Sequence, residues 1–229
     1  MIHKNTDLII TVSENRPETI GYRSIIFERP IGFDYESGDW IDIQFGDRQL
    51  QGGKTYSLSS SPTEPYLMIT FKDGLSEIKR GLSLLGKGDR IKIIQYGNDY
   101  KFRLKPHKSG VLIAGGVGIA PFRSMIKEMV DTNADNEIVL VYINKSPDLL
   151  FKAELDDWIN RMPHVRMENI ITDNLKSKER VKAITSAIGD LESKFYIAGP
   201  EDMVESTEHL LIYLGVSIDD IKIDSFSGY

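Results

Sequence analysis

The apolar pattern of this 229-residue chain changes near residue 105, and this change constrains the fold more than any other feature. Before that point the apolar runs are short and rich in β-branched residues, and turn residues separate them. These runs cover residues 8–12, 22–27, 40–45, 66–71 and 90–94. Short strands at this spacing are typical of an antiparallel sandwich or a small barrel.

One segment of the first half breaks the strand pattern. Residues 76–85 have helical spacing, and Ser76 is well suited to be the N-cap. The apolar residues of this segment would share one helix face; they are Ile78, Leu82 and Leu85. We therefore expect a short helix between two strands of the first half.

The second half alternates apolar strands with segments of helical spacing. The expected strands cover residues 111–114, 138–143, 165–172, 195–198 and 221–226. The expected helices lie near residues 122–130, 150–158, 179–188 and 201–214. Such alternation predicts a mostly parallel sheet with helices on both faces. The polar stretch 105–110 separates the two patterns.

The composition excludes several kinds of chemistry. The chain has no cysteine, so it cannot form a disulfide, a thiol nucleophile or a cysteine-ligated zinc or iron–sulfur site. The four histidines are scattered and lack the spacing of metal ligands, so we expect no metal. A formal net charge of −6 argues against nucleic acid as a partner.

The sequence shows no export signal or membrane span. The first six residues are polar, and no long apolar core follows them. The longest apolar stretch, residues 110–121, contains four glycines and is too short to cross a bilayer. We therefore expect a cytoplasmic protein.

A glycine-rich segment carries the strongest single signal. Residues 114–121 read AGGVGIAP, directly after one expected strand and directly before a helix. Glycines allow the backbone to approach a phosphate closely, and a helix N-terminus offers free N–H groups. The segment therefore favours dinucleotide binding over a plain turn. The next strand ends in Asn144 and Lys145, so a carboxylate that would bind the ribose is not evident.

A second segment, residues 54–60, reads KTYSLSS. On a strand, Lys54, Tyr56 and Leu58 would share one face because side chains alternate with period two. Taken alone, this segment indicates only a surface strand.

Together the segments resemble the ferredoxin–NADP reductase superfamily. That family has an R-x-Y-S-x-x-S strand in its flavin domain and a GGxGI(T/A)P turn in its nicotinamide domain. Further matches lie in the family's order: SGDW at 37–40, LLGKGD at 84–89, YIAGPEDM at 196–203 and DSFSGY at 224–229. The resemblance covers almost the whole chain. It implies an antiparallel flavin-binding β-barrel domain over residues 1–106 and a Rossmann-like NAD(P)-binding α/β domain over residues 107–229.

The resemblance also implies roles for individual residues. Tyr56 would lie against the flavin ring, Ser57 would offer its hydroxyl near the flavin N5–O4 edge, and Phe226 would cover the flavin face. For the flavin, the expected binding residues are Lys54, Tyr56, Ser57, Leu58, Ser59, Lys72, Gly74, Ser76 and Phe226. For the nicotinamide dinucleotide they are Gly115, Gly116, Gly118, Ile119, Pro121, Asn144, Lys145, Gly199, Pro200 and Met203.

The function implied by the resemblance is that of an FAD-dependent oxidoreductase, with FMN the less favoured flavin. Hydride would pass from NAD(P)H to flavin N5, and electrons would continue to a separate acceptor such as ferredoxin. The alternatives are an NAD(P)H:flavin reductase and a non-catalytic flavin-binding module. Two departures from the family pattern stand out: Lys54 replaces an arginine, and Ala198 replaces a frequent cysteine. The choice between NADH and NADPH stays open.

Overall fold

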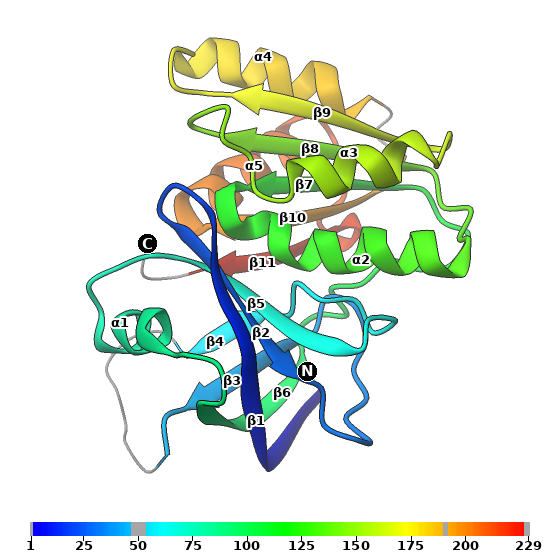
Figure 1. Cartoon of the computed structure of the whole chain (residues 1–229). Coiled ribbons are helices and arrows are strands. Elements are labelled where there is room, and N and C mark those ends of the chain that lie inside the picture. Colours follow the sequence, from blue (N-terminus) through cyan, green and yellow to red (C-terminus); the bar gives the residue numbers. More distant parts are fainter. Residues whose placement is uncertain (1, 47–53, 190–191, 227–229) are drawn as a thin grey trace.

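The computed structural model describes residues 2–46, 54–189 and 192–226 (Figure 1). The strands of the first half form one six-stranded antiparallel sheet in the order β4-β3-β6-β1-β2-β5. These strands are β1 (Ile2–Thr19), β2 (Tyr22–Glu28), β3 (Trp40–Gln44), β4 (Thr55–Ser57), β5 (Tyr66–Lys72) and β6 (Arg90–Asn98). A bridge between Leu58 and Ile69 brings the two edge strands together. The sheet is therefore a nearly closed barrel, as the resemblance implies.

The barrel interior holds a continuous apolar core. Alternate residues of the strands point inward, and the most deeply buried include Phe27, Ile41, Leu58 and Phe71. Helix α1 (Glu77–Leu84) adds Ile78 and Leu82 to this core, which confirms the predicted helix.

Strand β1 is much longer than the apolar run at residues 8–12. Its first part pairs with β6 and its second part with β2, and the register shifts between Asn5 and Leu8 and again between Val12 and Glu14. Polar flanking residues therefore extend the strand because they have backbone partners on two neighbours. The hydrophobic pattern of a short segment cannot predict such pairing, because the partner strands lie elsewhere in the sequence.

The second half forms a five-stranded parallel sheet in the order β11-β10-β7-β8-β9. Its strands are β7 (Gly110–Gly115), β8 (Ile138–Asn144), β9 (Val165–Ile171), β10 (Lys194–Pro200) and β11 (Ile221–Phe226). Its helices are α2 (Ile119–Thr132), α3 (Lys152–Asn160), α4 (Ser177–Ile188) and α5 (Glu201–Tyr213), with single 3₁₀ turns η1 (Gly116–Gly118) and η2 (Ile218–Asp220). The predicted division after residue 106 falls between β6 and β7.

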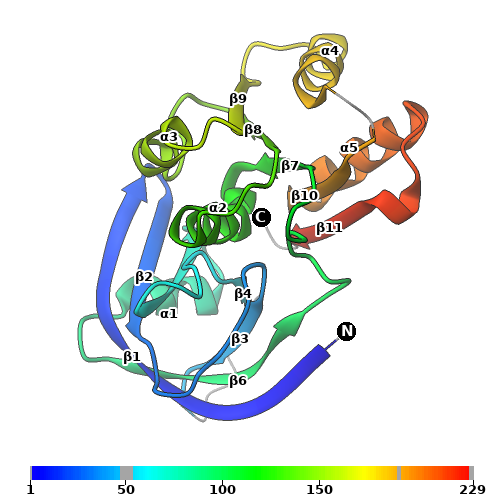
Figure 2. The ribbon, with the colours of Figure 1, turned by 90° about the vertical axis from the view of Figure 1, so that its right-hand side faces the viewer.

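Helices cover both faces of the parallel sheet (Figure 2). Helices α2 and α3 pack on one face, where Phe122 and Leu155 join the core. Helices α4 and α5 pack on the other face with Ile188 and Leu211. Both faces of the sheet are thus buried, which explains why its strands are almost continuously apolar.

A buried polar network joins α2 to the barrel. The Arg123 side chain is only 3% exposed and donates to Glu64 Oε2 at 2.8 Å, to Glu154 Oε1 at 2.8 Å and to the Ser59 carbonyl at 2.8 Å. Next to it, Ser124 Oγ donates to the Ser60 carbonyl at 2.6 Å. These contacts fix how the barrel and the parallel sheet meet, because a buried cation must keep its partners.

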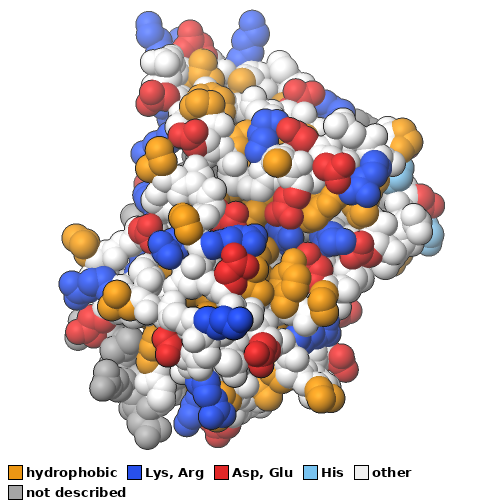
Figure 3. All heavy atoms as spheres, in the orientation of Figure 1, with side chains coloured by type: hydrophobic (Ala, Val, Ile, Leu, Met, Phe, Trp, Pro, Cys, Tyr) orange, Lys and Arg blue, Asp and Glu red, His pale blue; other side chains and the backbone are white. Residues whose placement is uncertain are grey.

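Charged side chains of both signs are interspersed on the face shown in Figure 3. Among the described residues, no helix is long and apolar enough to cross a membrane.

Candidate functional site

The strand order places the candidate dinucleotide site. From β7 the chain runs outward through β8 and β9, then returns to the other side of β7 with β10. In parallel sheets, ligands bind beyond the carboxyl ends of the strands where the order reverses in this way. Gly115 ends β7 and Pro200 ends β10, so the two predicted glycine segments meet at this point.

Close packing at this edge requires the glycines. A Cβ on Gly118 would lie 2.0 Å from the carbonyl oxygen of Ala198, and a Cβ on Gly115 would lie 2.4 Å from Met203 Cε. Gly116 has φ +54°, and a Cβ there would lie 3.5 Å from the Tyr22 hydroxyl of the barrel. The first two glycines therefore allow backbones and side chains to meet, whereas Gly116 lies at the junction with the barrel.

Replacing Gly118 by alanine should lower the free energy of unfolding by about 1–3 kcal/mol, because the added methyl group meets a backbone carbonyl that cannot move freely. Urea unfolding measures this loss. Gly86→Ala is the matched control, since its Cβ would lie 3.9 Å from the nearest atom, Asp89 Oδ2. Equal stability of the two variants would contradict the close approach.

Strand β4 presents its last two side chains, Tyr56 and Ser57, to opposite sides of the barrel wall. Tyr56 is buried in the barrel core, edge-on to Phe71 with ring centroids 6.2 Å apart, and burial raises the pKa of its hydroxyl. Ser57 points outward, and its Oγ donates to Asp224 Oδ2 of β11 at 2.9 Å. The barrel and the parallel sheet therefore meet at a hydroxyl–carboxylate pair.

Asp224 has an unusual environment for a carboxylate. Burial raises its pKa to about 6, the charge of Asp99 raises it as well, and the hydrogen bond from Ser57 opposes both. A carboxyl group in this range can hold or release a proton near neutral pH. Its chemistry therefore suits proton transfer rather than simple ion pairing.

The other predicted residues of the 54–60 segment differ in burial and in the partners of their side chains. Tyr56 and Leu58 share the buried face as expected, but Lys54 precedes β4 and its Nζ lies 3.2 Å from Asp42 Oδ2. Its backbone carbonyl accepts from the N–H of Ile43, so Lys54 lies beside a core residue of β3 while its half-exposed side chain reaches Asp42. Ser59 is fully buried, and its hydroxyl contacts Met68 and Thr70 of β5.

The start of α1 gathers positive charge. Ser76 Oγ accepts from the Lys79 backbone N–H at 3.4 Å, which confirms the predicted N-cap. Burial lowers the pKa of Lys79, and the charge of Lys72 lowers it further. A Cβ on Gly74 would lie 2.7 Å from Lys79 Cδ, so glycine leaves room for the lysine stem. A partly buried lysine with a second lysine nearby, at the N-terminal turn of a helix, is a suitable environment for an anion.

The remaining predicted residues surround the edge of the parallel sheet. Phe226 pairs with Pro200 across β11 and β10 and packs on the core beneath α2. Ile119 and Pro121 are buried in the first turn of α2. Asn144 donates to the Ser146 carbonyl at 2.9 Å, and Lys145 is exposed.

Three residues of this site were missing from the sequence prediction. Asp224 belongs to a segment that carried the resemblance, although only Phe226 received a role there. Lys79 lies three residues after the N-cap Ser76. A basic residue in the first turn of a helix is the local signal that indicates an anion site there. Tyr22 had no sequence signal, because only the tertiary structure brings it to Gly116.

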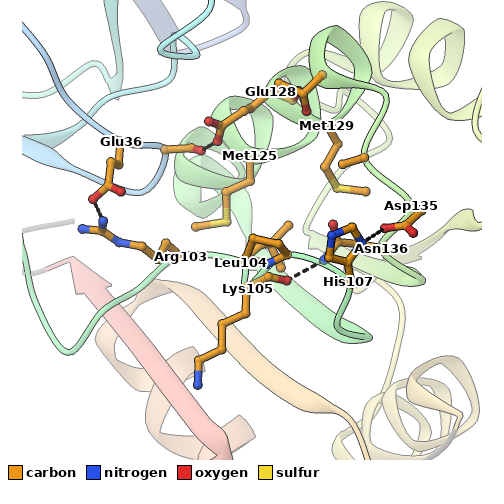
Figure 4. Close-up of a pocket in the computed structure, with 14 residues that line it drawn as sticks. Glu36, Arg103, Leu104, Lys105, His107, Met125, Glu128, Met129, Asp135 and Asn136 are labelled. Carbon is orange, nitrogen blue, oxygen red and sulfur yellow. Dashed lines mark hydrogen bonds and ion pairs between the residues drawn. The ribbon is translucent and has the colours of Figure 1, made fainter.

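A separate cavity of about 350 Å³ lies where residues 103–107 join α2 (Figure 4). Several of its charged residues are paired within the wall: Arg103 pairs with Glu36, His107 pairs with Asp135, and Glu128 accepts from the Ser37 hydroxyl. None of its lining residues belongs to the predicted site. Within the described ranges, no group of His, Asp and Glu side chains could hold a metal ion.

Comparison with known proteins agrees with this geometry. Residues 112–209 match the family described as oxidoreductase NAD-binding domain. The glycine betaine monooxygenase reductase subunit of Chromohalobacter salexigens is 24% identical over 229 residues, covering 92% of this chain and 62% of that protein. The chain thus spans less than two thirds of the length of the first curated relatives it matches.

Two solved structures share the whole architecture. The flavohem-like FAD/NAD binding domain of nitric oxide dioxygenase from Vibrio cholerae has a TM-score of 0.79 at 20% identity, covering 97% of this chain and 99% of that one. A ferredoxin NADP+ reductase from Neisseria gonorrhoeae with bound FAD and NADP has a TM-score of 0.77 at 18% identity, covering 95% and 98%.

The nearly closed barrel, the parallel sheet and the glycine turn at its switch point define a two-sheet reductase architecture with an oxidoreductase NAD-binding domain. The chain therefore carries an oxidoreductase NAD-binding domain over residues 112–209, and its whole fold is similar to that of ferredoxin NADP+ reductases of known structure.

Proposed function

We propose that this protein is an FAD-dependent NAD(P)H oxidoreductase that passes electrons to a separate acceptor. The observation that supports the proposal is the hydrogen bond from Ser57 to Asp224, which joins the barrel to the parallel sheet and which would serve there as a proton-accepting pair. In the overall reaction NAD(P)H loses two electrons and one proton, the acceptor takes the electrons, and the proton passes to solvent. We also propose that residues 1–106 hold FAD and residues 107–229 hold NAD(P)H.

The residues at both positions suit these ligands. Lys72, Lys79 and the N-terminus of α1 would hold the flavin phosphates, since all three favour negative charge. The turn at Gly116, with φ +54°, would hold the nicotinamide dinucleotide at the start of α2. A bound flavin supplies hydride acceptance at N5 and single-electron release.

The protein's own part is positioning and proton control. Ser57 is held on its outward side because its hydroxyl donates to Asp224. The Ser57 oxygen keeps lone pairs that can accept a proton, and Asp224 can take the proton that the hydroxyl gives up. Arg123 fixes the two sheets against each other, which sets the spacing on which hydride transfer depends.

The proposal includes a separate protein that accepts the electrons. The matched monooxygenase reductase subunit is named as one part of a larger system, and this supports a separate partner for this chain. A ferredoxin is one candidate acceptor. The alternative is an NAD(P)H:flavin reductase that releases its flavin, and the Lys54–Asp42 pair favours it, because this lysine is already paired with a carboxylate.

Anaerobic stopped-flow mixing with NADH and NADPH in parallel tests the proposal. We expect the purified protein to carry FAD and at least one coenzyme to bleach its absorbance near 450 nm. Protein that reduces added flavin without retaining it would favour the flavin reductase. Bound flavin that neither coenzyme reduces would contradict the oxidoreductase.

Replacing Lys79 by methionine should weaken FAD binding about tenfold, because the variant keeps the packed stem but loses a cation worth roughly 1–2 kcal/mol beside the phosphates. Fluorescence titration of flavin-free protein measures the dissociation constant. Lys87→Met, in the exposed turn before β6, is the matched control. Equal weakening by both variants would show only a general charge effect and would contradict a phosphate site at α1.

A further inference from the structure

The turn between β1 and β2 brings a tyrosine of the barrel to the glycine turn before α2. Tyr22 begins β2 and lies opposite Lys72 of β5, and the carbonyl of the neighbouring Gly21 accepts from the Asp73 N–H at 2.8 Å. The Tyr22 hydroxyl lies 3.5 Å from the position that a Cβ on Gly116 would take. A side chain of the barrel therefore reaches the candidate dinucleotide edge of the parallel sheet.

Asn144 approaches the same position from the parallel sheet. It is the last residue of β8, and its Nδ2 donates to the carbonyls of Ser146 at 2.9 Å and Asp148 at 3.3 Å. These two contacts set the orientation of the amide, because only its nitrogen can donate to a carbonyl. The Asn144 Oδ1 consequently faces Gly116, 4.0 Å from the same Cβ position. Two oxygens from different sheets thus lie around one point.

Both oxygens are available to a ligand. Across residues 2–46, 54–189 and 192–226, no protein group forms a hydrogen bond with the Tyr22 hydroxyl or with Asn144 Oδ1. Both side chains are only partly buried, so solvent reaches them. Gly116 has no side chain, and within the described residues an added Cβ would meet nothing closer than 3.5 Å, so the space between the two oxygens can hold a further atom.

The two oxygens differ in the hydrogen bonds that they can form. Burial raises the pKa of Tyr22, so its hydroxyl keeps its proton at neutral pH and can donate, whereas the amide oxygen of Asn144 only accepts. A ligand group between them must therefore accept one hydrogen bond and donate another. An ionised phosphate oxygen only accepts and would leave Asn144 Oδ1 without a donor. A ribose hydroxyl of a nicotinamide dinucleotide meets the requirement through a single oxygen.

We propose that Tyr22 and Asn144 together bind a ribose hydroxyl of the nicotinamide dinucleotide. In dinucleotide-binding folds this contact commonly falls to a carboxylate after the second strand. Strand β8 ends in Asn144 instead, and a phenol–amide pair takes the place of the carboxylate. Because Tyr22 belongs to the barrel, the bound coenzyme contacts both sheets. The identity of the ligand rests on the proposed function.

Calorimetric titration of the purified protein with NAD+ and NADP+ tests the site, and the tighter-binding coenzyme is used for the variants. Tyr22→Phe removes only a hydroxyl that has no partner among the described residues, so its stability in urea should match that of the wild type. Its coenzyme dissociation constant should rise about fivefold, as expected for the loss of one hydrogen bond. Tyr213→Phe is the matched control, since it removes an exposed hydroxyl at the far end of α5, and it should leave binding unchanged.

Two coenzyme analogues identify the hydroxyl. One lacks the free hydroxyls of the nicotinamide ribose, and the other lacks those of the adenosine ribose. The analogue without the recognised hydroxyl should bind the wild type and Tyr22→Phe equally, and the other analogue should preserve the difference between them. Equal binding of the intact coenzyme by the two proteins would overturn the proposal. A difference that persists with both analogues would also overturn it, because the Tyr22 hydroxyl would then contact another part of the coenzyme.

The outcomes separate this site from the proposed function. Wild-type protein that binds neither coenzyme would overturn both. Anaerobic reduction of the bound flavin by NADH or NADPH is measured separately on the wild type. Coenzyme binding that depends on the Tyr22 hydroxyl, without any reduction of the flavin, would reject the oxidoreductase and leave the ribose site intact.

Discussion

Replacing Ser57 by alanine is expected to slow reduction of the bound flavin by NAD(P)H about 100-fold. A positioned group that accepts and passes on a proton at a reacting centre commonly contributes about 10²–10⁴ in rate. Ser57 is in such a position because Asp224 holds its hydroxyl at the junction of the two sheets. Single-turnover stopped-flow mixing under anaerobic conditions measures the effect without any acceptor.

The same variant should change the carboxylate that Ser57 contacts. The hydrogen bond from Ser57 lowers the pKa of Asp224, so its removal should raise that pKa above about 6. Ser57→Thr keeps the hydroxyl and should restore part of the rate. Ser13→Ala, which removes another barrel hydroxyl that donates to the Ile26 carbonyl, is the control. A rate within threefold of the wild type would contradict the role given to Ser57.

Replacing Arg123 by methionine is expected to lower the free energy of unfolding at pH 7 by about 3–5 kcal/mol. The loss arises because Glu64, whose side chain is only 7% exposed, keeps its charge but loses its main partner. Methionine preserves much of the packing against the rings of Phe151 and Trp158. Urea unfolding measures the change, and Arg161→Met is the control because its pair with Asp157 is exposed.

The loss at Arg123 should depend on pH. Burial raises the pKa of Glu64, but the hydrogen bond and charge of Arg123 hold it below its ordinary value. In the wild type this carboxylate therefore adds stability above its unfolded pKa and loses it as the pH falls. Without Arg123, only the hydrogen bonds from Tyr66 and Ser61 still oppose burial, so the pKa of Glu64 rises and protonation of Glu64 reduces the loss of stability as the pH falls. The deficit should shrink between pH 7 and pH 5, and a constant deficit would contradict this account.

Several local features could be predicted from neighbouring residues alone. The strand at residues 221–226 and the helix capped by Ser76 were predicted with almost their observed bounds. In both cases the decisive information lies within one turn or one strand, as side-chain periodicity or a capping hydroxyl. The length of β1 could not be predicted in this way, because its polar ends are strand only through pairing with β6 and β2.

The candidate site likewise has some features that neighbouring residues predict and others that depend on contacts between distant segments. The glycines of the 114–121 segment act through the backbone next to them, so their spacing was sufficient to predict a turn suited to a dinucleotide. The partner of Ser57 lies 167 residues away on β11, and no local pattern relates the two. The ion pair of Lys54 with Asp42 likewise depends on the pairing of β3 with β4, which periodicity along the chain does not predict.

The sequence by itself determined the two kinds of sheet, the glycine turn and the absence of thiol chemistry, because periodicity, backbone freedom and composition are local properties. Only the tertiary structure decided which charges lie together. It buried Arg123 between Glu64 and Glu154 and brought Asp224 to Ser57. Electrostatic energies depend on distance and burial, and both are set by folding rather than by order along the chain.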